Sequence, residues 1–169
     1  SWEDDHRDKN AVYCYSPFDK DGDHKPDLLW EKKIPYSMFQ SPVIANLDGS
    51  SDGTMEVIIK SHQTSDIFIL DHNGNELRRL NPNVADENDH NYSALTVADL
   101  DNDGQMEIIA SYDSLGIYIW RQDGTPFTTN PFWGAVILRL ASAPVVCDLN
   151  EDGKKEILFS QRQMAESHI

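Results

Sequence analysis

The sequence has few basic residues for its size. Lysine and arginine together number 14 against 29 aspartates and glutamates, so the formal net charge is −15. Such a surplus repels phosphate groups, which argues against nucleic-acid binding and against docking on an anionic membrane. The carboxylates therefore need either a solvated surface or bound cations.

Cysteine is almost absent. Only Cys14 and Cys147 occur, each in an apolar stretch typical of a strand. Two cysteines this far apart form neither a disulfide framework nor a zinc-binding pattern. We expect two small core residues, and a single bridge between them stays open as an alternative.

The sequence also lacks a long hydrophobic run. Its longest apolar stretch, residues 132–147, is interrupted by Arg139 and is too short to cross a bilayer. No signal peptide is recognisable at the start, so we expect a mature protein or a piece of a larger one. At 169 residues the chain is long enough for one domain with a core.

Familiar catalytic motifs are missing as well. There is no His-Glu-x-x-His, no Gly-x-Ser-x-Gly and no glycine-rich phosphate loop. The six histidines are scattered without metal-ligand spacing. The residues alone therefore favour a binding module over an enzyme.

What the sequence does contain is an internal repeat. Residues 41–48, 94–101 and 143–150 align, and each segment leads through an acidic, glycine-containing loop into an apolar run. A second shared element, at 67–77 and 117–127, has an aromatic and β-branched run followed by Asn-Gly or Asp-Gly, which predicts a hairpin. The N-terminal part resembles the same hairpin with a longer turn.

One repeat unit thus has four antiparallel strands in about 50 residues, which is typical of a propeller blade. Because no helical periodicity is sustained, we predict an all-β fold. Residues 1–169 form one partial β-propeller, and about three blade equivalents are expected within it: strands C and D of a split blade at 12–34, blades at 41–80 and 93–129, and strands A and B of a split blade at 143–160. Propellers need four to eight blades, so the others would come from a longer parent chain or a second subunit.

The loop at 99–107 predicts a calcium site. Calcium binds six to eight oxygens, and aspartates at alternate positions of a tight loop can supply them. Gly104 permits the sharp turn. A simple turn needs one aspartate and one glycine, whereas several converging carboxylates repel one another unless a cation is bound. The loop is not an EF-hand, because position twelve is Ala110. The predicted ligands are Asp99, Asp101, Asp103, Gln105 through its carbonyl, and Glu107.

Two other loops repeat this pattern less fully. The third repeat has one neutral ligand, and the first has two extra residues, with Ser50 as a possible helper. Their predicted ligands are Asp148, Asn150, Asp152, Lys154 and Glu156, and Asn46, Asp48, Asp52 and Glu56. A further acidic segment, with Asp19, Asp21, Asp23 and Asp27, has His24 in place of the glycine and fits a solvated loop equally well.

Residues 97–109 and their two companions resemble the FG-GAP/VCBS repeats of integrin α-subunits and of many secreted bacterial proteins. The Phe-Gly and Gly-Ala-Pro signatures are absent, which favours the broader VCBS-like group over integrin kinship. The resemblance implies a β-propeller, calcium in the loops between strands A and B, and an extracellular or secreted setting. It does not imply a partner, because propellers host unrelated functions.

We therefore expect a calcium-stabilised extracellular module that serves adhesion, glycan or protein binding, with calcium in a structural role. Aromatic contacts from residues 131–134 and an N-glycosylation sequon at Asn91 are further candidates. The alternative is a fragment of a secreted, lyase-like polysaccharide enzyme, because some polysaccharide lyases with calcium-rich propellers carry similar repeats. Such an enzyme would need a basic residue in an acidic site, and the candidates are Lys60, Arg121, Arg139 and Arg162.

Overall fold

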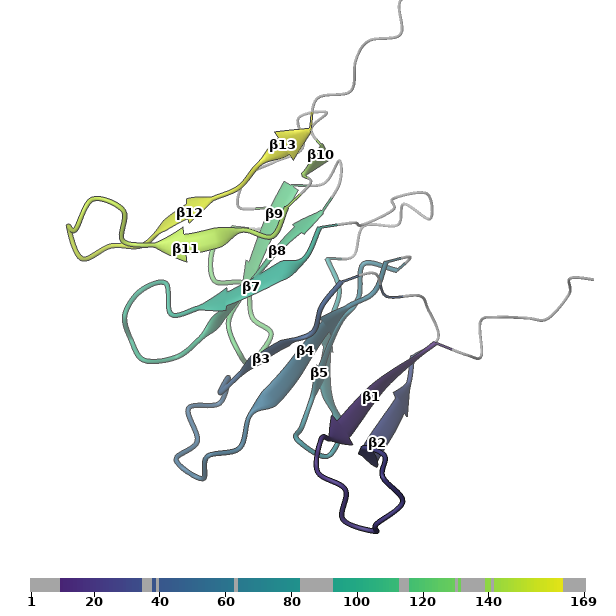
Figure 1. Ribbon diagram of the computed structural model, residues 1–169. Coiled ribbons are helices and arrows are strands. Elements are labelled where there is room, and N and C mark those ends of the chain that lie inside the picture. Colours follow the sequence, from purple (N-terminus) through teal and green to yellow (C-terminus); the bar gives the residue numbers. More distant parts are fainter. Residues whose placement is uncertain are drawn as a thin grey trace, which may run out of the picture.

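The structure is a computed structural model that describes residues 10–34, 38, 40–62, 64–82, 93–112, 116–129, 131, 139–140 and 142–162. All thirteen elements in these residues are β-strands, joined in antiparallel pairs (Figure 1), which confirms the all-β prediction. No helix in these ranges is long and apolar enough to cross a membrane. Residues 132–134 and Asn91, which carry the aromatic-contact and sequon predictions, lie outside the described residues.

One sheet has four strands in chain order, β3 (Val43–Ala45), β4 (Glu56–Lys60), β5 (Ile67–Leu70) and β6 (Glu76–Leu80). The Ile-Phe-Ile-Leu run of β5 favours a strand because β-branched and aromatic side chains pack well on a pleated surface. All four of its residues are buried. The connection to β6 is the predicted tight hairpin.

The next sheet has three strands, β7 (Leu95–Ala98), β8 (Glu107–Tyr112) and β9 (Gly116–Trp120). We expected a fourth strand within 93–129, and this prediction is wrong for the described residues. After the Asp-Gly turn the chain makes only an isolated bridge between Trp120 and Pro126. Proline has no backbone N–H to donate, so one hydrogen bond of the ladder is lost at this position, although the next residue, Phe127, still donates to Ile119.

Two-stranded sheets flank these two. β1 (Ala11–Ser16) pairs with β2 (Asp27–Lys33), and β11 (Val145–Cys147) pairs with β12 (Glu156–Leu158). Cys14 and Cys147, in these flanking sheets, are free and only partly buried, so the single bridge does not form and neither is a fully buried core residue. A short pair that the repeat did not predict joins β10 (Arg139–Leu140) to β13 (Gln161–Arg162).

The sheets stack face to face and bury three apolar clusters between them. The first cluster, with Ile59 and Phe68, also contains Trp30 of β2. The second, with Ile58 and Trp120, joins β3–β6 to β7–β9. The third packs β8 and β9 against β11 and β12. Because the inner strands β4, β5, β8 and β9 are covered on both faces, they read as hydrophobic runs rather than as alternating patterns.

This stacking determines where the acidic loops lie. In Figure 1 the sheets form a fan, and the loops that join β1 to β2, β3 to β4, β7 to β8 and β11 to β12 project from the same side of it. Each of the four acidic segments named above as a candidate metal site is one of these loops. The fold therefore gathers the carboxylates along one rim.

Candidate metal centres

The loop between β7 and β8 brings three carboxylates together. Oxygens of Asp99, Asp101 and Glu107 all lie within 4.8 Å of one another. Glu107 is the first residue of β8 and only 1% exposed, whereas the two aspartates lie nearer the surface. These hard oxygen donors on a short loop are the ligands that Ca²⁺ prefers.

Backbone hydrogen bonds fix this loop around one aspartate. Asp99 accepts hydrogen bonds from the N–H groups of Asp103 at 3.1 Å and Gly104 at 3.0 Å. Gly104 has a φ of 87°, a left-handed conformation that suits glycine. In the described part of the chain no backbone N–H donates to Asp101, which instead pairs with Arg121 at 3.8 Å.

The predicted ligands at the remaining two positions are placed differently. Asp103 lies outside the three-carboxylate group and accepts a hydrogen bond from the backbone N–H of Gln105 at 2.7 Å. The side-chain carbonyl of Gln105 accepts a hydrogen bond from Gln122 at 2.5 Å. The side chain of Gln105 thus contacts the next turn of the same sheet.

The surroundings of Glu107 disfavour its charged form. Burial raises the pKa of this carboxyl above its ordinary 4.5, and the charges of Asp101 and Asp103 raise it further. A hydrogen bond from the backbone N–H of Leu100, at 2.8 Å, acts in the opposite direction. A divalent cation between the carboxylates would remove this repulsion, so the donor set fits calcium.

The loop between β11 and β12 has the same backbone arrangement 49 residues later. Asp148 accepts hydrogen bonds from Asp152 at 3.1 Å and Gly153 at 2.8 Å, and Lys154 donates its N–H to Asp152 at 2.9 Å. Glu156 accepts from Leu149 at 2.7 Å, as Glu107 does from Leu100. The amide of Asn150 stands where the loop between β7 and β8 has Asp101, so this site has one negative charge fewer.

The loop between β3 and β4 holds its ligands less tightly together. Glu56 is 5% exposed and accepts a hydrogen bond from Leu47 at 2.7 Å. Asp52 instead bonds within its own turn, where hydrogen bonds from Ser50 and Thr54 lower its pKa to about 2. Ser50 donates its N–H to Asp48 at 2.8 Å.

One atom in this loop still indicates a cation. The side-chain oxygen of Asn46 is buried and has no hydrogen-bond partner among the described residues, although its amide nitrogen donates to Ser50 at 2.8 Å. A buried polar atom without a partner is costly and calls for an explanation. Coordination of a cation together with Asp48 and Glu56 would satisfy it.

The segment between β1 and β2 resembles the loop between β7 and β8 more closely than its sequence indicated. Asp19, Asp21 and Asp27 bring carboxylate oxygens within 4.8 Å of one another. His24 has a φ of 65° and donates its N–H to Asp19 at 2.8 Å, as Gly104 does to Asp99. The histidine therefore occupies the glycine position despite its side chain, which spacing alone could not predict.

Comparison with known proteins bears on this rim of loops. A family model of the FG-GAP-like repeat matches residues 47–110, which run from the loop between β3 and β4 through the loop between β7 and β8. This part of the chain is thus similar to an FG-GAP-like repeat. The matched segment includes the strands β4, β5, β6 and β7 and the first four residues of β8.

The chain is also similar to a solved structure that contains more than this repeat. It matches the V. cholerae biofilm matrix protein Bap1 with 25% sequence identity and a TM-score of 0.53. The match covers 80% of this chain and 20% of that chain, so it spans about a fifth of the length of Bap1. No curated protein matches the sequence.

Proposed function

We propose that the chain is a calcium-stabilised extracellular module of β-propeller type that serves adhesion, glycan or protein binding. The observation that carries this proposal is the three-carboxylate group at Asp99, Asp101 and Glu107, held in a loop of an FG-GAP-like repeat. Calcium would join the end of β7 to the start of β8 and offset carboxylates that otherwise repel one another. Its role is structural.

The propeller and its setting have separate support. The stacked antiparallel sheets, with acidic loops along one rim, support the proposal of successive propeller blades. Further blades would come from a longer parent chain or a second subunit. Similarity to a biofilm matrix protein favours an extracellular adhesive role, and the net charge of −15 disfavours nucleic acid as a partner.

Asp101 allows a sharp test of the calcium site. Asp101→Asn removes a ligand charge without removing a backbone hydrogen bond of the loop. We expect calorimetric titration of the metal-stripped protein to lose one binding event or to show it weakened by at least about tenfold. Glu31→Gln, on the exposed part of β2, removes the same charge away from the loops and is the control. Equal calcium binding by wild type and both variants would contradict the proposal.

A polysaccharide-active enzyme is the second candidate. Of its possible basic groups, Lys60 is 2% exposed and donates to the carbonyl oxygens of Ser93 and Ser111, and Arg121 pairs with Asp101. The side chains of Arg139 and Arg162 lie outside the described part. Incubation with acidic polysaccharides separates the candidates: unsaturated product absorbance favours the enzyme, and retention on a glycan array without product favours the binding module.

A further inference from the structure

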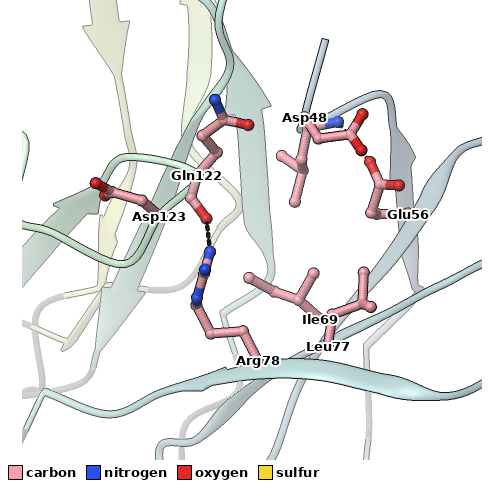
Figure 2. Close-up of a pocket in the computed structure, with 8 residues that line it drawn as sticks. Asp48, Glu56, Ile69, Leu77, Arg78, Gln122 and Asp123 are labelled. Atoms are coloured by element: carbon pink, nitrogen blue, oxygen red, sulfur yellow. Dashed lines mark hydrogen bonds between the residues drawn. The ribbon is translucent and has the colours of Figure 1, made fainter. Parts of the chain in front are cut away.

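Successive sheets of the fan are joined by a junction that is built the same way twice. Trp30 of β2 donates its indole N–H to the carbonyl oxygen of His72 in the β5–β6 turn, at 2.9 Å. One sheet later, Arg78 of β6 donates to the carbonyl oxygen of Gln122 in the turn after β9 (Figure 2). His72 and Gln122 each lie two residues before the glycine of their turn. The stacking of the sheets is therefore as repetitive as the sequence.

The last sheet, β11–β12, carries a copy of the stacking face, but there the face is open. The third residues of β4 and β8, Ile58 and Ile109, are each 0% exposed, because each packs in a cluster with the sheet that follows. The third residue of β12, Leu158, is 41% exposed. Its partner across the ladder, Val145, is 58% exposed. The outer face of β11–β12 thus lacks the sheet that its counterparts have.

The matching face lies on the first large sheet. Val97 of β7 and Val146 of β11 each pack against the sheet that precedes their own, in the clusters of Ile58 and Ile109. Ile44 holds the same place in the first repeat, as the middle residue of β3, but it is 67% exposed. The chain therefore carries both halves of one stacking interface, each uncovered. β3 and β11–β12 cannot meet within one copy, because two other sheets' strands, β4–β6 and β7–β9, lie between them in the fan (Figure 1).

The strand edges beside these faces are also complementary. In the described part of the chain β12 pairs only with β11, whereas its counterparts β4 and β8 each pair with a further strand as well. β1 has the pattern of that further strand, because its residues 12–15 repeat the alternation of residues 67–70 in β5. In both strands the register shifts after the third of these residues, at Cys14 and at Ile69. β1 is thus built as the strand that β12 lacks.

β1 also has an uncovered face. Tyr13 and Tyr15 are 50% and 53% exposed, although the equivalent side chains of β5, Phe68 and Leu70, are 1% and 0% exposed. Two large aromatic side chains on one strand face keep apolar surface in water unless another element covers them. The same association that pairs the edge of β1 can therefore bury its face.

We propose that β12 pairs with β1 of a second copy of this chain. The order β11–β12–β1–β2 then reproduces the order β3–β4–β5–β6, and Ile44 of the second copy covers Val145 and Leu158 of the first. Two identical junctions join the two copies head to tail into a closed ring of six sheets, within the range of propellers. The assignment rests on the proposed propeller-type function and names the second subunit and the strands that join it.

A second copy satisfies more of these surfaces than another occupant does. A separate extended peptide can add to the edge of β12, but it leaves Ile44 and the tyrosines of β1 uncovered. The side chains that meet at the junction are apolar, so the repulsion between two chains of charge −15 acts mainly through their acidic rims. Calcium on the rims and salt at about 0.15 M reduce that repulsion, and both belong in the assay buffer.

The association is tested by sedimentation velocity of the full chain in this buffer, where we expect the mass of two chains. Ile44→Asp places a charge on the interface at a position that is exposed in a single copy, so it should weaken the dimer at least about tenfold. Leu77→Asp is the matched control, because Leu77 is 58% exposed on β6, outside the junction. A wild type that stays single or forms open-ended polymers, or equal association of both variants, would overturn the proposal.

The register is tested by a cross-link to the native Cys14. Because Ile58 lies opposite Ile69, Leu158 should lie opposite Cys14 of the second copy, at a separation that suits a disulfide. In a Cys147→Ser background oxidised with copper phenanthroline, we expect Leu158→Cys to give at least about tenfold more disulfide-linked dimer than Val145→Cys. Val145 is the control because it lies one strand farther from β1. Equal yields, or none, would refute the pairing.

The same samples separate this proposal from the proposed function. Melting curves with and without calcium report on the metal sites, whereas mass and cross-linking report on the junction. A single chain whose Tm responds to calcium would reject the dimer and leave the calcium-stabilised module standing. A dimer whose Tm ignores calcium would do the reverse.

Discussion

At the residue scale, the charged form of Glu107 is opposed by burial and by neighbouring carboxylates. It is 1% exposed, bonded to a backbone N–H, and faces Asp101 and Asp103. A carboxylate in this position destabilises the metal-free fold but becomes a strong ligand once a cation is present. The same side chain should therefore have opposite effects in the two states.

Glu107→Gln tests this reversal. The amide keeps an acceptor for the N–H of Leu100 but loses the charge. In EDTA we expect the Tm to rise by roughly 2–4 °C, because a buried and repelled charge is gone. In calcium we expect a lower Tm than wild type and at least about tenfold weaker calcium binding. Differential scanning calorimetry in both buffers gives the measurement, and a change of the same sign in both would refute the account.

The raised pKa of Glu107 also predicts a pH dependence. In the metal-free protein the folded state holds this proton at a pH where the unfolded chain has lost it, so stability falls as pH rises from 4.5 through the raised pKa. Calcium competes with the same proton. The part of the Tm gain that comes from this loop should therefore be full above the raised pKa and be lost as pH falls through it, which paired melting curves between pH 4 and 7 can check. A calcium effect that persists unchanged at pH 4 would count against Glu107 as a ligand.

At the element scale, the strands could be predicted because each carries a strong local pattern. Sheet β3–β6 follows from its β-branched runs and Asn-Gly turn. The fourth strand of the next sheet failed because Pro126 removes a donor, although Phe127 still donates to Ile119 at 3.0 Å. The two-residue strands β10 and β13 have no periodicity to detect, so long-range pairing alone defines them.

The candidate sites were predictable to a similar degree. Alternating aspartates identified the group at Asp99, Asp101 and Glu107. The sequence could not reveal that Asp52 bonds to Thr54, or that His24 adopts the conformation of a glycine. The sequence also did not predict a cleft lined by Asp48, Ile69 and Gln122, because its lining comes from two sheets that meet only in the folded chain.

Packing between sheets can be tested at one turn. Gly74, between β5 and β6, has a φ of 81°, and a Cβ there would lie 2.8 Å from the ring of Trp30 on β2. The indole N–H also donates to His72 at 2.9 Å. We expect Gly74→Ala to cost about 1–3 kcal/mol beyond the backbone penalty, because the ring has to shift.

Gly53 provides the control for that substitution. Its φ is 80°, nearly the same, but nothing lies within 4 Å of an added Cβ. Urea unfolding of both alanine variants in calcium-free buffer therefore separates the clash with Trp30 from the backbone cost. If the two variants lose equal stability, the contact between β2 and the β5–β6 turn contributes nothing.

At the scale of the whole molecule, the central claim is that calcium holds together the rim of a stacked β-sheet module. The chain has a net charge of −15, and its acidic loops gather on one side of the fan. The metal-free state should therefore be weakened along the rim while the three apolar clusters between the sheets persist. Calcium then acts on the stability of the fold.

The most direct measurement is the thermal unfolding of the full chain in about 1 mM calcium and again in excess EDTA. For a site with a Kd of about 10 μM, ligand linkage stabilises the folded state by roughly 2.7 kcal/mol. That corresponds to a rise in Tm of several degrees for each occupied loop. We predict a clearly higher Tm in calcium, which magnesium at the same concentration does not reproduce. Superimposable melting curves in calcium and EDTA would contradict the account.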